Sequence, residues 1–93
     1  MQLHQIKQKA VPILLKHKIR KAALFGSYAM GEATEKSDID ILVDLSTKIS
    51  LLDFIGIKLE LEDELGVKVD LVEYNAVKPL LKEQILKYQI PII

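Results

Sequence analysis

The chain has 93 residues, with thirteen basic and thirteen acidic residues, two histidines and no cysteine. That length predicts a single domain, residues 1–93, and the lack of cysteine excludes a disulfide framework or a thiolate metal site while fitting a reducing interior. No apolar run approaches the roughly 20 residues that span a bilayer, so we expect a cytoplasmic protein with no membrane partner. The balanced charge also argues against direct nucleic-acid binding, because phosphate contacts usually require a basic excess.

The first predicted element is an amphipathic helix. Apolar residues recur at three- and four-residue spacing between Leu3 and His17, which is the helical period. Pro12 lies inside this pattern and would bend the helix or mark a late start. The basic residues 16–21 sit where the helix should end, so they either complement the helix dipole or form a charged docking surface.

Two short strands follow, joined by a polar segment. Residues 21–25 form a short run that is apolar after Lys21 and leads into Gly26-Ser27, which indicates a strand entering a tight turn. Residues 28–37 are polar and predict a short helical turn and a loop. Residues 39–43 then predict the second strand.

The second half of the chain repeats the alternation of helix and strand. Ser50 is a good N-cap and Gly66 a good helix stop, so they bound a predicted helix. Residues 67–74 predict a third strand, residues 75–88 a last helix, and the apolar tail 89–93 either packs on the domain or awaits a partner. The order predicts an α/β (α+β) fold: a small mixed sheet with helices packed on one face.

Three aspartates stand in or beside otherwise apolar strands. Because side chains alternate along a strand, Asp38 and Asp40 should share one face while Ile39 and Ile41 point into the core. Adjacent carboxylates repel each other unless a cation or water separates them, and Mg²⁺ prefers such hard oxygen ligands. If the third strand lies beside the second, Asp70 completes a three-carboxylate site that could hold two metal ions.

Gly26 and Ser27 directly follow the first predicted strand. Glycine lets the backbone approach a phosphate closely, and the serine hydroxyl and neighbouring amides can donate to phosphate oxygens. Taken singly, Gly-Ser also fits an ordinary turn, and each aspartate fits a solvated charge at a sheet edge. Together they predict a site for a metal-bound nucleoside triphosphate.

The spacing Gly-Ser, ten residues, Asp-x-Asp stands within Ala-Leu-Phe-Gly-Ser-Tyr-Ala-Met-Gly and Lys-Ser-Asp-Ile-Asp-Ile-Leu-Val. It resembles the minimal nucleotidyltransferases (MNT) of the DNA polymerase beta superfamily, and the likeness covers nearly the whole chain. Many of these proteins are antitoxins paired with a HEPN-domain RNase toxin. The resemblance implies a nucleotidyltransferase fold and, in a hetero-oligomer with the toxin, transfer of AMP from ATP to a toxin tyrosine. It also implies that Gly26 and Ser27 hold the triphosphate, that Asp38 and Asp40 ligate magnesium, and that Asp70 is the third ligand and base.

One departure from the family pattern leaves alternatives open. Many relatives carry arginines just after Gly-Ser, where this chain has Tyr-Ala-Met. The phosphate contact is then absent, or is supplied by Lys36, Arg20 or the partner. A binding-only antitoxin that occludes its toxin is therefore a second hypothesis. A transferase acting on a small molecule or an RNA end is a third.

Overall fold

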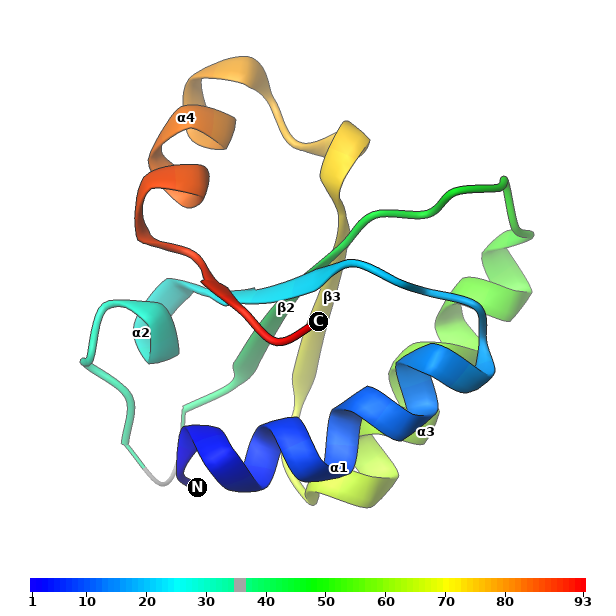
Figure 1. Cartoon of the computed structure of the whole chain (residues 1–93), viewed down its shortest axis with the longest axis horizontal. Coiled ribbons are helices and arrows are strands. Elements are labelled where there is room, and N and C mark those ends of the chain that lie inside the picture. The colour runs from blue at the N-terminus through cyan, green and yellow to red at the C-terminus, as the bar shows by residue number, and fades with distance from the viewer. Residues whose placement is uncertain (35–36) are drawn as a thin grey trace.

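The computed structural model describes residues 1–34 and 37–93. Its elements follow the predicted alternation (Figure 1). They are α1 (Leu3–Lys16), β1 (Ala22–Phe25), α2 (Gly26–Ala29), β2 (Ile39–Val43), α3 (Leu51–Leu65), β3 (Val69–Glu73), the 3₁₀ turn η1 (Tyr74–Ala76), α4 (Pro79–Tyr88) and β4 (Ile90–Pro91).

The strands form one mixed sheet in the order β3-β2-β1-β4. β1 runs antiparallel to both β2 and β4, whereas β2 and β3 are parallel and are connected through α3. A parallel pair needs a long crossover, and α3 supplies it. The sequence therefore predicted the mixed sheet, and the structure adds β4 as its fourth strand.

Helices α1 and α3 cover one face of the sheet (Figure 1). Each contributes a stripe at helical spacing to the core, where it meets alternate residues of the strands. The side chains that α1, α3 and strands β1 to β3 bury in this core are Ile6, Ala10 and Leu14 from α1, Ile57, Leu61 and Leu65 from α3, and Ala22, Leu24, Ile39, Ile41, Val43, Val69 and Leu71 from the sheet.

The first and third helices end much as predicted. The Ser50 hydroxyl accepts a hydrogen bond from the Asp53 amide at 3.0 Å, and Gly66 closes α3 in the left-handed conformation. α1 continues through Pro12, which is exposed. Part of the basic cluster after α1 is structural, because Lys16 and His17 both pair with Glu60 of α3.

Helix α4 differs from its predicted course. It begins at Pro79 rather than at residue 75, because Lys78 is held extended before the proline. It has no buried residue and approaches the face opposite α1 and α3. There Leu86 lines a small pocket of about 90 Å³ together with Ala23 and Leu42 of the sheet.

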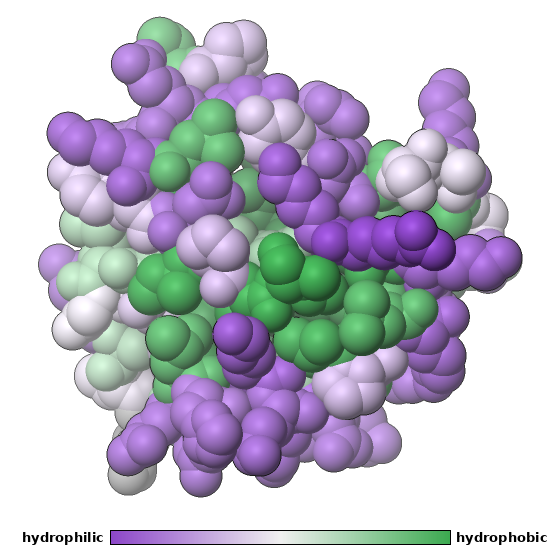
Figure 2. All heavy atoms as spheres, viewed as in Figure 1, coloured by the Kyte–Doolittle hydropathy of each residue, from purple (hydrophilic) through white to green (hydrophobic). Residues whose placement is uncertain are grey.

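The tail packs on the domain, which decides between its two predicted roles. β4 pairs with β1, and the Ile92 amide donates to the Ala22 carbonyl oxygen at 2.9 Å. Ile92 itself is buried in the core. On the face of the molecule that Figure 2 shows, hydrophobic side chains gather across the middle between hydrophilic margins. Within the described ranges, no helix is both long and apolar enough to cross a membrane.

Candidate active site

The candidate site lies where β1 ends and β2 begins. In the antiparallel register Phe25 is opposite Asp40, so the next residue, Gly26, lies against the Asp40 side chain. Gly26 adopts a φ of +67°, and a Cβ atom added there would be 3.0 Å from Asp40 Cγ and closer still to Oδ2. Glycine is therefore required at position 26 for two reasons: the backbone has a positive φ, and the neighbouring carboxylate leaves no room for a Cβ atom.

The alternation predicted for the second strand is confirmed. Ile39 and Ile41 are fully buried on the core face, while Asp40 is half-buried and Asp38, just before the strand, is exposed. Asp40 therefore projects from the face of the sheet that α1 and α3 leave uncovered. The fold leaves this face accessible to a ligand.

Asp70 meets Asp40 across the parallel strands, as the sequence predicted for adjacent second and third strands. The two residues are direct partners in the β2–β3 register, and Asp70 is exposed. Partial burial raises the pKa of Asp40, and the negative charges of Asp70 and then Asp38 raise it further. In the described part of the chain, no Lys, Arg or His lies within 4.0 Å of these carboxylates to offset that repulsion.

The three aspartates fit a magnesium ion by their chemistry. Residues 1–34 and 37–93 contain no ready-made group of three acidic or histidine side chains around one ion position. Magnesium does not need such a cage, because it keeps several waters and is bound through one or two carboxylates and substrate phosphates. The three aspartates offer only oxygen donors, and among the described residues no nearby cation offsets their negative charge. The site is also open on the side where phosphates would enter, so it meets that requirement.

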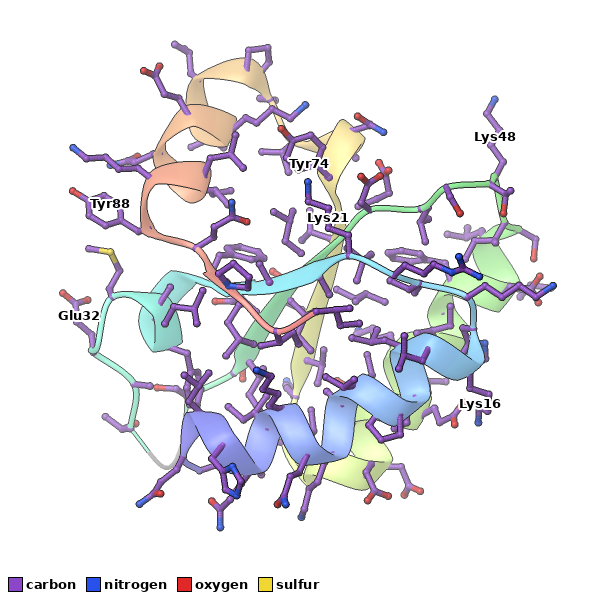
Figure 3. The ribbon with its side chains drawn as sticks, viewed as in Figure 1. Lys16, Lys21, Glu32, Lys48, Tyr74 and Tyr88 are labelled. Carbon is purple, nitrogen blue, oxygen red and sulfur yellow. The ribbon has the colours of Figure 1, made fainter. Side chains whose placement is uncertain are left out.

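A pocket of about 290 Å³ extends from Gly26 to α4. In Figure 3, Tyr88 projects on the side of the molecule where Glu32 follows α2. The pocket was not predicted from the sequence. The apolar residues of α4 recur at three- and four-residue spacing, and that spacing indicates a face packed on the core as readily as a face that lines a ligand pocket. Its lining residues are Phe25, Gly26, Met30, Leu81, Gln84, Ile85 and Tyr88.

The remaining expected phosphate contacts have different outcomes. Ser27 lies half-buried in α2, directly beside Gly26, and its carbonyl oxygen accepts a hydrogen bond from the Glu32 amide at 2.9 Å. Arg20 precedes β1, and Lys21 and the four residues of that strand separate it from Gly26 along the chain, so its role as a phosphate contact stays a prediction. Lys36 lies outside the described residues.

Comparison with known proteins decides the family. The model of the family described as "Polymerase beta, Nucleotidyltransferase" matches residues 8–93. The chain belongs to this nucleotidyltransferase family. A Methanocaldococcus jannaschii protein named "Putative protein adenylyltransferase" is 48% identical over 93 residues, which is 100% of both chains.

Two solved structures of similar fold extend the comparison. A crystal structure of a toxin–antitoxin with AMP-PNP matches with a TM-score of 0.83 and 26% identity, covering 94% of this chain and 72% of that chain. A "putative minimal nucleotidyltransferase" matches with a TM-score of 0.82 and 39% identity, covering 96% of this chain and 91% of that chain. The predicted nucleotidyltransferase fold with a small mixed sheet is confirmed, and the sheet has four strands.

Proposed function

We propose that this nucleotidyltransferase transfers AMP from ATP to a tyrosine hydroxyl of a HEPN-domain RNase toxin and thereby acts as its antitoxin. The carrying observation is the strand register that brings Gly26, Asp40 and Asp70 to one accessible face of the sheet. The likeness to a named adenylyltransferase and to a toxin–antitoxin structure with AMP-PNP supports the same reaction.

ATP would lie between the aspartates and α4. Gly26 admits the triphosphate close to the backbone, and the Ser27 hydroxyl donates to a phosphate oxygen. The pocket beside Gly26 has room for the base, with Phe25 and Tyr88 offering aromatic surfaces. The amide of Gln84 can both donate and accept hydrogen bonds at the base edge.

Asp38, Asp40 and Asp70 would hold two magnesium ions at the phosphate end of this site. When bound, magnesium supplies charge neutralisation of the triphosphate and activation of the attacking hydroxyl. Asp70 is more exposed than Asp40, its partner on the neighbouring strand. It accepts the phenolic proton as the tyrosine oxygen attacks the α-phosphorus. A new oxygen–phosphorus bond forms, and pyrophosphate leaves with the electrons of the broken bond.

The direct test is incubation of the protein with ATP, magnesium and the product of the neighbouring gene, followed by intact-mass measurement. We expect added AMP on that product, and none with Asp38→Ala. Glu64→Ala is the control, because Glu64 is an exposed acid on α3 outside the site. If the wild-type protein adds no AMP, or if Asp38→Ala adds it equally well, the proposal is wrong.

A binding-only antitoxin is the second candidate, and two observations favour it. The three residues directly after Ser27, Tyr-Ala-Met, carry no basic side chain, and Arg20 precedes β1 at the end of the strand away from Gly26. If occlusion is sufficient, Asp40→Ala will still protect cells from the toxin although it transfers no AMP. Loss of protection in a folded Asp40→Ala protein would exclude occlusion as the mechanism.

A further inference from the structure

Helix α3 carries a second apolar stripe that nothing in this structure covers. Its core stripe packs inward, yet four more large apolar side chains are exposed along a different side of the helix. A surface helix normally has one apolar stripe and polar residues on the rest of its surface, so a second exposed stripe is a candidate contact surface. The exposed residues, with their exposed fractions, are Leu51 (73%), Leu52 (82%), Ile55 (40%) and Leu59 (57%).

The two ends of this stripe carry opposite charges. Lys48, exposed just before α3, projects beyond the N-terminal end of the helix (Figure 3). Asp63, also exposed, lies in the last turn, which contains no basic residue to balance the negative end of the helix dipole. In the described part of the chain neither side chain has an ion-pair partner within 4.0 Å.

We propose that α3 pairs antiparallel with α3 of a second copy of this chain, about a two-fold axis that passes between Ile55 and Gly56. Residues equally distant from that axis then face each other. Leu52 faces Leu59 of the second copy. Asp63 lies beside the N-terminal end of α3 of the second copy, the end from which Lys48 projects. A two-fold interface requires such self-complementarity, and each contact occurs twice.

Gly56 also fits this arrangement. Glycine is unfavourable inside a helix, and a Cβ added at Gly56 would meet no atom within 4 Å, so packing within one copy does not require it. In the pair, Ile55 of one copy faces Gly56 of the other, where the missing side chain admits the isoleucine. The continuous apolar contact lies at the centre and the charges lie at the rim, as in stable interfaces.

The pairing leaves the candidate active site open. α3 packs on the core face of the sheet, whereas Asp40 projects from the opposite face. A dimer joined through α3 would therefore present two active sites directed away from the interface. The proposal does not depend on the transfer reaction, so it can fail or succeed separately from the proposed function.

The absence of cysteine in the sequence permits a direct test by single-cysteine cross-linking. We expect Ile55→Cys, next to the axis, to form a disulfide-linked dimer under mild oxidation. Leu80→Cys is the control, because Leu80 is 89% exposed on α4 and belongs to no proposed interface. Equal cross-linking rates for the two variants would overturn the proposal.

Sedimentation velocity on the unmodified protein gives the second measurement. Wild type should sediment as a dimer, and Leu52→Glu should weaken the dimer at least tenfold without changing the circular dichroism spectrum. Lys48→Asp and Asp63→Lys should each weaken it, and the double variant should restore it. A monomeric wild type, with α3 variants that lose only toxin binding, would instead assign the stripe to the toxin and refute the pairing.

Discussion

Replacing Gly26 with alanine tests whether the close contact between the glycine backbone and Asp40 is part of the active site. The added Cβ would lie 3.0 Å from Asp40 Cγ and 3.4 Å from its Cβ, so the carboxylate must rotate away. The backbone cannot relieve the contact easily, because residue 25 is paired with residue 40 in the sheet. The change therefore combines backbone strain with displacement of a candidate ligand.

The two effects have different magnitudes and different readouts. A non-glycine residue in the left-handed region costs about 1–2 kcal/mol. In a domain of this size that lowers Tm by about 4–8 °C for each kcal/mol. Displacing a reacting group by about 1 Å can cost about 100-fold in rate. We therefore expect Gly26→Ala to fold with a lower Tm and to transfer AMP about 100-fold more slowly.

Gly66→Ala separates strain from contact. Gly66 has a φ of +73°, but a Cβ added there would meet nothing within 4 Å. It should lower Tm by a similar amount and leave the transfer rate within about twofold of wild type, measured by intact mass over time at saturating ATP. If Gly26→Ala transfers AMP as fast as Gly66→Ala, the contact with Asp40 has no catalytic consequence and the reasoning is refuted.

Three further predictions concern charge and packing. Because burial and then the neighbouring carboxylates raise the pKa of Asp40 above its ordinary 3.8, its ionisation should make wild type less stable as pH rises from about 4. Asp40→Asn should flatten that dependence in thermal melts and abolish stabilisation by magnesium and ATP. Hydrogen bonds from His17 and Lys16 lower the pKa of Glu60, so its stabilising effect is present above pH 4.5 and lost as pH falls below; melts of Glu60→Gln should lack that acid-dependent loss. Ile92→Ala should cost about 2–5 kcal/mol in denaturant unfolding, against less than about 0.5 kcal/mol for the exposed Leu80→Ala, and equal costs would mean that the tail is not part of the core.

Local rules predicted most of the fold. The N-cap Ser50 and the stop at Gly66 bounded α3, because both act through neighbouring backbone groups. β4 was not predicted as a strand, because only two residues pair and their partner in β1 lies almost 70 positions away in the sequence. The start of α4 was misplaced because the extended residue before Pro79 outweighed the helical spacing that precedes it.

In the candidate site too, local features could be predicted from the sequence and features that depend on tertiary packing could not. Alternation along a strand was sufficient to place Asp40 opposite the buried Ile39 and Ile41. The meeting of Asp40 with Asp70 depended on which strands are neighbours, so it could be predicted only conditionally. The pocket between Gly26 and α4 depended on the position of a helix with no buried residue, which periodicity does not determine.

The position of β3 at the end of the sheet has a consequence for work with the purified protein. A terminal strand presents unpaired backbone groups along its outer side, and charged side chains discourage a foreign strand from joining it. Asp70 and Glu73 interrupt an otherwise apolar run, Val69 to Tyr74, and so act as gatekeepers against aggregation. Asp70→Ala would therefore lower solubility as well as remove a carboxylate. Asp70→Asn keeps a polar side chain on that strand, so it is the variant in which lost activity can be attributed to chemistry.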